Sequence, residues 1–399
     1  MNMLIPSVLL PSRPKSFYRL ALMNFFFVMG ILFSSWAIRI PDIKNSLALS
    51  DAELGGILFG APLGQLLAIA PAAWLIGRFG SRHAIIGGMC IMPLALVTLS
   101  LAPSRLWLLA ALAFFGFANN ILNISLNAQA VGVEALYGRS IMGTFHGMWS
   151  VGGVIGGIVG AIIAPLGVSP LAHFMVIYCY ALLTLAIMLR SIMPREVGKG
   201  NRKENHNPSK IHPDMYLALL GIIAFGSFAI EGAMYDWTAV YFAQILNVQE
   251  ELVRVGYVAC LTAMVIGRLT ADSLVNRFNV VFVLQMSGLC VALGLSLALL
   301  FPSLAPATFG FALVGFGMAS IVPLCFSLAG KSDKFSAQVS ISFVASISYF
   351  GLLIAPPMIG VLSESLNLRW ALSPLALIGV CIVALAAILK RMRGEGLHL

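Results

Sequence analysis

The chain has 399 residues, of which 60% are hydrophobic and only 10% carry a charge, and its formal net charge is +9. A soluble globular protein carries roughly 25% charged residues, so the composition excludes an ordinary water-soluble domain. The natural solvent of such a chain is lipid, and we predict an all-α integral membrane protein.

Twelve apolar stretches follow one another along the chain, each long enough to be a transmembrane helix. Crossing a bilayer takes about 20 mostly apolar residues. In chain order, we predict spans over residues 17–38, 52–74, 83–102, 106–131, 141–165, 170–192, 214–243, 251–272, 279–301, 305–330, 337–362 and 368–389. The polar segment 194–213 lacks apolar periodicity and is predicted to be a cytoplasmic linker. It separates an N-terminal six-helix bundle, residues 1–193, from a C-terminal six-helix bundle, residues 214–399.

Lys and Arg residues are distributed unevenly between the two sides of these spans. Of the 24 basic residues, 19 fall on the side of the termini and the linker. The five on the other side are Arg39, Lys44, Arg105, Arg254 and Arg369. By the positive-inside rule, this bias predicts a multi-pass protein with both termini in the cytoplasm. Because the charge is scattered over loops beside the spans, we expect contact with the lipid bilayer and no nucleic-acid partner.

The two halves of the sequence repeat each other at a spacing of about half the chain. The segment Leu75-Ile76-Gly77-Arg78-Phe79, after the second span, aligns with Leu274-Val275-Asn276-Arg277-Phe278, after the eighth, 199 positions later. Glu134 and Asp333 share this offset. The repeat predicts two pseudo-symmetric six-helix units. Parallel repeats of this kind occur in alternating-access transporters, with the substrate between the halves near the bilayer midplane.

The loop after the second span also resembles the signature Gly-x-Leu-x-Asp-Arg-x-Gly-Arg-Arg/Lys of the major facilitator superfamily. Leu75, Arg78, Gly80 and Arg82 keep its frame, while Gly77 stands in place of its Asp. Shorter segments are similar to a bacterial branch near the fucose permeases: Ser35-Trp36-Ala37-x-Arg39, His146-Gly147-x-x-Ser150, Glu231-Gly232, Asp236-Trp237, Gly267-Arg268 and Pro356-Pro357-x-x-Gly360. The resemblance implies that superfamily's fold and a place in the bacterial inner membrane. It also implies secondary active transport, such as symport.

Glu231 lies well inside the seventh predicted span, where an ionisable group is costly and therefore a functional candidate. Tyr235, four residues later, shares its helical face. A carboxyl group in a low-dielectric cavity can exchange a proton as the cavity opens to either side, which makes Glu231 the candidate for proton coupling. A structural carboxyl group bonded to a neighbouring helix is the alternative.

Amide side chains are concentrated in the fourth predicted span. Asn119, Asn123 and Asn127, at i, i+4 and i+8, form one polar stripe. Amides both donate and accept hydrogen bonds, which suits hydroxyl-rich ligands such as sugars. We therefore predict a substrate-binding lining, with interhelical hydrogen bonding as the alternative. In fucose-permease relatives a Glu stands four residues before the Asn that aligns with Asn127. Because Asn123 occupies that position, the resemblance implies that any coupling carboxyl group lies elsewhere.

His146 and Trp149, in the fifth predicted span, are further candidates for the substrate site. An imidazole can hydrogen-bond a solute or titrate near neutral pH, and an indole can stack on a sugar ring. Ser346 and Tyr349 occupy the equivalent face of the eleventh span and are expected to form the opposite wall. An intramembrane His that only packs and hydrogen-bonds is the alternative for His146.

Charged and aromatic residues near the span ends are predicted to act as gates. On the cytoplasmic side we expect two clusters that stabilise one of two conformational states. They comprise Arg78, Arg82, Glu134 and Arg139 in the first half, and Arg268, Asp272, Arg277 and Asp333 in the second. At the outer mouth we expect Trp36, Arg39, Asp236 and Trp237.

The sequence contains no complete catalytic, metal-binding or cofactor-binding motif among those considered. The chain has no H-E-x-x-H and no G-x-S-x-G, and Cys325 occupies the first glycine position of the only phosphate-loop-like segment. We therefore predict a transporter without a cofactor, which carries a small sugar-like solute, with protons as the expected coupling ion, and acts as a monomer. The alternatives are an exporter of amphipathic compounds, favoured by 18 Met and 25 Phe, and a non-transporting membrane solute sensor.

Overall fold

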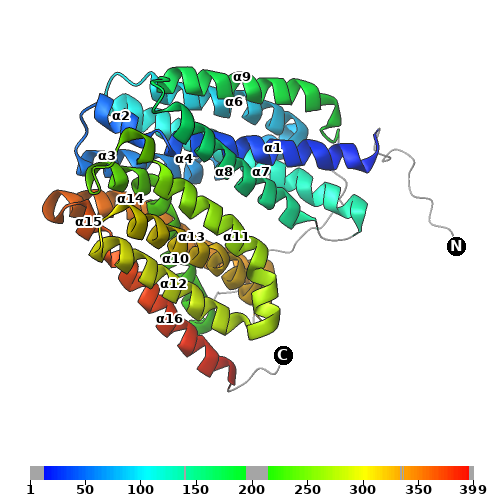
Figure 1. The fold of residues 1–399 in the computed structure, drawn as a ribbon. Helices are drawn as coiled ribbons and strands as arrows, with labels where there is room; N and C mark the ends of the chain where they lie inside the picture. The colour runs from blue at the N-terminus through cyan, green and yellow to red at the C-terminus, as the bar shows by residue number, and fades with distance from the viewer. Residues whose placement is uncertain (1–12, 139–140, 195–213, 333–334, 336, 395–399) are drawn as a thin grey trace.

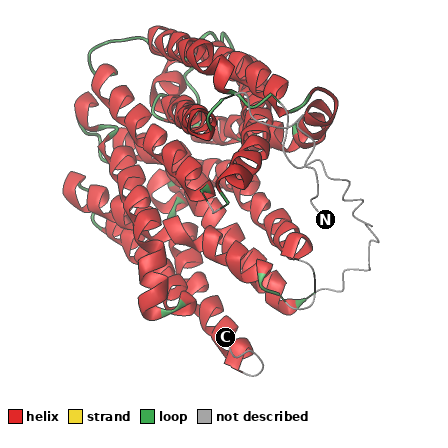
Figure 2. Ribbon diagram, turned by 90° about the vertical axis from the view of Figure 1, so that its right-hand side faces the viewer, coloured by secondary structure: helices red, strands yellow, loops and turns green. Residues whose placement is uncertain are grey.

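The computed structural model describes residues 13–138, 141–194, 214–332, 335 and 337–394. Within this part of the chain the regular structure is helical, with short connecting loops (Figure 2). Twelve spans among the described residues are long and apolar enough to cross a membrane. The twelve predicted spans are confirmed, and their ends agree with the structure to within a few residues, except where the first, second, fourth and eighth helices run further, to Ser46, Phe79, Tyr137 and Phe278.

The N-terminal half contains six of these spans. They comprise α1 (Lys15–Ala37) with α2 (Ile40–Ser46), then α3 (Asp51–Leu58), α4 (Gly60–Leu67) and α5 (Ile69–Phe79) in one span, then α6 (Ser81–Ser100), α7 (Arg105–Tyr137), α8 (Met142–Ile163), and α9 (Pro170–Met188) with η2 (Leu189–Ser191). The second span is broken twice. Pro62 and Pro71 lack the N–H groups that would bond to the carbonyl groups of Leu58 and Leu67, and α3 and α4 end at those two residues.

The C-terminal half contains the other six spans. They comprise α10 (Met215–Gln244), η3 (Glu250–Leu252) with α11 (Val255–Phe278), α12 (Val280–Leu300), α13 (Leu304–Gly330), α14 (Ala337–Leu366), and α15 (Leu368–Ala371) with α16 (Ser373–Gly394). The predicted linker lies outside the described residues, apart from Pro194 at its start.

The internal repeat extends to backbone conformation. Three pairs of residues at corresponding places of the two halves have positive φ: Ala48 with Asn247, Gly80 with Asn279, and Gly167 with Asn367. The first two pairs are 199 positions apart and the third is 200 apart. Each marks a tight turn before or after a span. Such matched left-handed turns agree with the predicted duplication of a six-helix unit.

Glycines allow the first and fifth spans to pack closely. A Cβ atom on Gly152 would lie 2.1 Å from the carbonyl oxygen of Phe27, and one on Gly160 would lie 2.3 Å from Cγ2 of Ile38. Gly156 contacts the same helix, next to Ile31. This stripe of small residues on α8 therefore places its backbone directly against α1, as is common in membrane helix pairs.

The two halves approach each other closely at one end of the molecule. There a Cβ on Gly55 of α3 would lie 2.6 Å from the carbonyl oxygen of Pro356 and 2.9 Å from Cα of Gly360, both in α14. At the opposite end, where α1 begins and α16 ends, the ribbons of the two halves diverge (Figure 1). We call these the closed end, which contains α2, α3 and α15, and the open end, which contains the turn between α5 and α6.

Candidate functional site

A polar cluster joins the two halves at mid-depth. Arg268 of α11 donates a hydrogen bond from Nη1 to Oγ of Ser150 in α8, at 2.7 Å. Its Nη2 lies 3.3 Å from Oε1 of Glu231 in α10, and its guanidinium carbon lies 5.9 Å from the ring centroid of Trp149. The Arg268 side chain is 31% exposed and that of Glu231 is 14% exposed. The cluster is thus an ion pair of the C-terminal half that also holds the N-terminal half.

Aromatic side chains cover this cluster on the side of the closed end. The hydroxyl group of Tyr235 donates to Oε1 of Glu231 at 3.3 Å, so the predicted shared face of these two residues is confirmed. The Tyr235 ring meets Phe33 of α1 edge-on, with centroids 5.1 Å apart. Beyond them, the hydroxyl groups of Tyr257 and Ser34 lie 3.1 Å apart across the two halves. Residues from both halves therefore line a small pocket at this point.

A second polar bridge between the halves involves Tyr349 of α14. Its hydroxyl group donates to Oε1 of Gln65 in α4. The backbone carbonyl group of Gln65 accepts a hydrogen bond from Nδ2 of Asn120 in α7 at 2.6 Å. Tyr349, predicted on the wall of the C-terminal half, thus contacts the opposite half directly. Gln65 was not among the predicted site residues, although it is a polar residue inside an apolar span.

The amide stripe of α7 is partly engaged within its own helix. Nδ2 of Asn127 donates to the backbone and side-chain oxygens of Asn123, at 2.8 and 2.9 Å. Oδ1 of Asn119 is buried and has no hydrogen-bond partner among the described residues. Gln129, just beyond Asn127, is tied to Met193 by two hydrogen bonds. The end of the stripe nearest Gln129 is therefore structural, and Asn119 offers an acceptor.

Of the remaining predicted wall residues, His146 lies beside the central cluster and Ser346 bonds within its own helix. His146 packs edge-on against Phe26, with ring centroids 5.4 Å apart. It lies one helical turn from Ser150, whose hydroxyl group also bonds to the His146 carbonyl group at 3.2 Å. Ser346 is exposed and donates to the carbonyl group of Ser342 within α14. The structure thus brings His146 near Arg268 through Ser150, and gives Ser346 a local partner.

Among the described residues, the predicted cytoplasmic gating residues do not gather into the two expected clusters. Arg82 donates to the carbonyl groups of Ile192 and Leu189 at the end of the sixth span, at 2.6 and 3.2 Å. Glu134 accepts from the backbone N–H groups of Ile141 and Met142 at 2.7 and 2.9 Å, where the dipole of α8 favours an anion.

The other predicted gating residues are placed differently. Arg78 and Arg277 are exposed and stack on the neighbouring rings of Phe79 and Phe278, 5.7 and 5.1 Å from the centroids. Arg268, predicted to gate beside Asp272, instead reaches Glu231 and Ser150 because it lies more than two helical turns before the end of α11. Arg139 and Asp333, and the side chain of Asp272, lie outside the described residues.

At the closed end, one carboxylate holds two buried arginines from opposite halves. Arg39 and Arg254 are each 1% exposed. Asp42 lies 3.1 Å from Nη1 of Arg39 and 2.6 Å from Nη2 of Arg254. Arg254 also pairs with Glu250 at 2.5 Å and donates to the carbonyl group of Ile38 at 3.2 Å. We call this set of five residues the outer latch, because two of its bonds to Arg254 cross between the halves.

A second set of polar contacts surrounds Asp51 at the start of α3. Lys44 lies 2.7 Å from its Oδ1, and Gln244 donates to the same atom at 3.3 Å. The hydroxyl group of Ser363 donates to Oδ2, and Oε1 of Glu364 accepts from the N–H group of Ala52 at 3.3 Å. Three of these contacts join the halves, so Asp51 anchors α3 to α10 and α14.

The predicted outer-mouth residues include one member of the outer latch. Arg39 belongs to it and also donates to His173 and to the carbonyl group of Val168. Trp36 and Trp237 are buried, at 3% and 0% exposure, and Asp236 is half-buried in α10. The acidic partners Asp42 and Asp51 were missed by the sequence prediction. Their proximity in the sequence to Arg39 and Lys44, two basic residues on the minority side, is the signal that could have found them.

Comparison with known proteins places this arrangement in a family. The family model of the Major Facilitator Superfamily matches residues 20–340. The chain belongs to the Major Facilitator Superfamily. Its relatives include an uncharacterized MFS-type transporter of Yersinia pestis, 32% identical over 92% of this chain and 94% of that protein. Another is the membrane protein MosC of Rhizobium meliloti, 30% identical over 92% of this chain and 89% of its own.

Solved superfamily structures share the fold. A bacterial homologue of the human lysosomal transporter Spinster, in an inward-facing and occupied conformation, superimposes with a TM-score of 0.76. The match covers 95% of this chain and 98% of that one, at 16% identity. A mutant form of the nucleoside transporter NupG gives a TM-score of 0.75, covering 93% and 99%, at 14% identity. The protein is thus a membrane transporter and not an enzyme, and its resemblance to the fucose-permease branch stays a prediction.

The described part of this superfamily member holds no group of three or more His, Cys, Asp or Glu side chains that could bind a metal ion. The central cluster presents the ion pair, hydroxyl and aromatic groups set out above. Such groups bind a solute by hydrogen bonds and stacking.

Proposed function

We propose that this superfamily member is a secondary active transporter that moves a small hydroxylated solute, a sugar or a sugar-like compound, by alternating access coupled to protons. The observation that carries the proposal is the bridge from Glu231 through Arg268 to Ser150. It places an intramembrane carboxyl group, whose function is the default expectation at such depth, at the point where the two halves meet.

The proposed orientation follows the positive-inside rule. Both termini and most Lys and Arg residues then face the cytoplasm, and the outer latch faces the opposite side of the bacterial inner membrane. In that orientation the conformation is closed to the outside. The match to an inward-facing Spinster homologue is consistent with this state.

Proton coupling would work through the strength of the Glu231–Arg268 ion pair. A proton on Glu231 removes its negative charge, so the ion pair with Arg268 is lost and only a weaker, neutral hydrogen bond can remain. Arg268 is then held mainly by Ser150 of the other half, and the relative stability of the two conformational states changes. His146, one turn from Ser150, is the second candidate for carrying a proton.

The side chains around the ion pair suit a hydroxylated solute. Trp149, beside Arg268, and Tyr235, beside Glu231, offer aromatic faces. Elsewhere on the predicted lining, Asn119 and Asn123 offer amide groups from α7, and Tyr349 offers a hydroxyl group from α14. Hydrogen bonding from amides with stacking on an aromatic ring is a usual way to hold a sugar. The structural neighbour named a nucleoside transporter carries a solute that contains a sugar, which supports the same substrate class.

The test is uptake of radiolabelled monosaccharides and nucleosides into proteoliposomes, with and without an inward proton gradient. In Glu231→Gln we expect gradient-driven accumulation to be lost while solute exchange at equal pH is kept, because only exchange needs no net proton movement. Glu251→Gln, which removes an exposed carboxyl group from η3, is the matched control and is expected to behave as the parent. Gradient-driven accumulation in Glu231→Gln equal to that of the parent would refute the coupling role.

A second arm tests the substrate class. If none of the hydroxylated solutes is exchanged while lipophilic cations bind and are expelled, the protein is an exporter of amphipathic compounds and the sugar proposal is wrong. In the sugar proposal, Trp149→Ala is expected to weaken solute exchange, because the proposed stacking on the indole ring is lost.

A further inference from the structure

Each half of the protein contains an apolar crevice, and the two crevices are related by the internal repeat. The first, of about 230 Å³, lies between α5, α6 and α7. The second, of about 180 Å³, lies between α11, α12 and α13. Leu75 and Phe79 of the first correspond to Leu274 and Phe278 of the second, 199 positions later. Neither crevice contributes to the central polar cluster.

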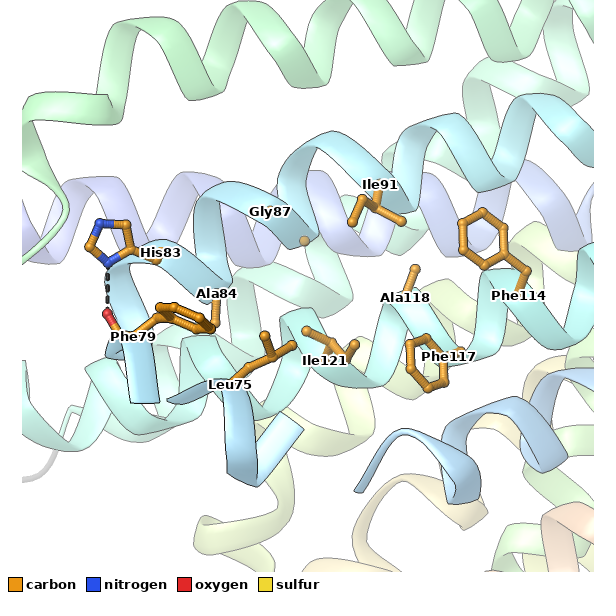
Figure 3. A pocket seen from close by; sticks show the side chains of 11 residues that line it. Leu75, Phe79, His83, Ala84, Gly87, Ile91, Phe114, Phe117, Ala118 and Ile121 are labelled. Carbon is orange, nitrogen blue, oxygen red and sulfur yellow. Dashed lines mark hydrogen bonds between the residues drawn. The ribbon is translucent and has the colours of Figure 1, made fainter. Parts of the chain in front are cut away.

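The first crevice is elongated and opens on the outer surface of the bundle. Figure 3 shows its lining side chains spread from Phe79 and His83 at one end to Ile91 and Phe114 at the other. Phe79, Ile91 and Phe114 are 50%, 43% and 41% exposed. The helix α6 packs on α7, α9, α5 and α1 of its own half. The crevice therefore faces the surroundings of the protein, away from the other half.

The crevice follows from the way the second span packs. In α4, Gly64 lies so close to α7 that a Cβ there would be 1.9 Å from the carbonyl oxygen of Ala113. After the break at Ala68, α5 presents the large side chains of Leu75 and Phe79 to α7 instead. The two helices are thereby held apart at the open end, and the space between them is lined by carbon.

An arginine lies beside each crevice, at the open end of the molecule. Arg78 lies over the ring of Phe79, and Arg277 lies over the ring of Phe278. Both arginines are exposed, and neither forms an ion pair with a described carboxylate. Phe79 and Phe278 line the crevices themselves, so each guanidinium group is fixed directly above an apolar slot.

We infer that each crevice binds one acyl chain of an anionic phospholipid, with the lipid phosphate on Arg78 or Arg277. The orientation is that of the proposed function, in which this end meets the cytoplasmic leaflet, whose lipids include anionic headgroups that attract Lys and Arg. The apolar slot takes the chain, since burial of each CH₂ group is favourable. The guanidinium group takes the phosphate, a geometry that arginine recognises well.

The two crevices differ in capacity. Gly87 in the first corresponds to Met286 in the second, and Ala84 corresponds to Val283. These larger side chains take up space in the second crevice, which is the smaller one although Cys290 and Ser320 stand where the first has Ile91 and Ile121. The first crevice is therefore expected to hold its lipid more tightly. It can also be filled by mutation, because a Cβ on Gly87 meets no atom within 4 Å.

The test is native mass spectrometry of the full-length protein in detergent, titrated with dioleoyl phosphatidylglycerol. Dioleoyl phosphatidylcholine, with the same chains, is the headgroup control. We expect two bound phosphatidylglycerol molecules in the parent, weaker binding at one site in Arg78→Ala or Arg277→Ala, and weaker binding at both sites in the double variant. The affinity of each affected site should fall roughly fivefold, the effect of about 1 kcal/mol per basic residue at an anionic surface. Arg190→Ala removes another exposed arginine from the same face and should leave both sites intact.

Gly87→Leu separates the chain from the headgroup. It should abolish one site while Arg78 is present, whereas Gly56→Leu, at another helical glycine with open space around it, should not. Melting temperatures of all variants show whether each is folded. If Gly87→Leu does not fold, the surface arginine variants still test the inference. Equal retention of phosphatidylcholine, equal loss in Arg190→Ala, or unchanged retention in Arg78→Ala and Arg277→Ala would overturn the inference. These outcomes are independent of whether the protein carries a sugar.

Discussion

Asp42 is the residue through which the closed end can be weakened most selectively. It joins Arg254 of one half to Arg39 of the other. In an outward-open state the bond to Arg254 is broken, whereas the bond to Arg39, within one half, remains. Asp42→Asn therefore destabilises the latched state relative to the open one. We predict that it shifts the conformational equilibrium toward opening of the closed end.

The size of the shift follows from burial. Removing one partner of a fully buried ion pair costs about 3–5 kcal/mol. Asp42 is 21% exposed and Glu250 remains to pair with Arg254, so we expect about 2 kcal/mol, or roughly a 30-fold change in the equilibrium constant. Glu250→Gln is the matched control. Its carboxylate meets the same arginine but is 56% exposed, so the expected change is below about 1 kcal/mol.

The assay is pulsed electron–electron resonance between nitroxide labels at Asn45→Cys and Gln249→Cys, with the six native cysteines replaced. Both positions are exposed and lie at the closed end on opposite halves. We expect a longer-distance population to grow in Asp42→Asn and to stay near the parent level in Glu250→Gln. Equal distance distributions in parent and Asp42→Asn, at equal melting temperature, would refute the latch. A larger effect of Glu250→Gln would show that burial does not set the energetics.

Three further predictions concern packing and the second bridge. Gly360→Ala places a Cβ 2.6 Å from a backbone oxygen across the closed end and should lengthen the same labelled distance, whereas Gly56→Ala, which meets open space, should not. Gly152→Ala should lower the melting temperature in detergent by several degrees because α8 must move away from α1, while Gly153→Ala, with nothing within 4 Å, should leave it unchanged. Tyr349→Phe removes a hydroxyl bond between the halves, worth about 1 kcal/mol. It should raise the solute concentration for half-maximal exchange several-fold if Tyr349 lines the site, and an unchanged value would exclude it from binding.

The sequence predicted the fold well because its signals are local. Span positions depend on runs of about 20 apolar residues, and the pairing of Glu231 with Tyr235 depends on helical periodicity. The contacts between the halves depend on packing that no local pattern encodes. From the sequence alone, Arg268 could be paired with Asp272, four residues away. Only the tertiary arrangement brings Arg268 to Glu231 on another helix. The breaks in the second span could have been read from Pro62 and Pro71.

The close contact of Gly55 with Pro356 and Gly360 has a consequence for turnover. Ordering a long side chain costs up to about 2 kcal/mol of conformational entropy, whereas a glycine has no rotamers to lose. Contacts between backbone atoms of the two halves can therefore form and break without the ordering of side-chain rotamers. The side chains that must be ordered at each closure are then those of Arg254 and of the contacts around Asp51, so the speed of the cycle can change by substitution there while the fit of the helices stays the same.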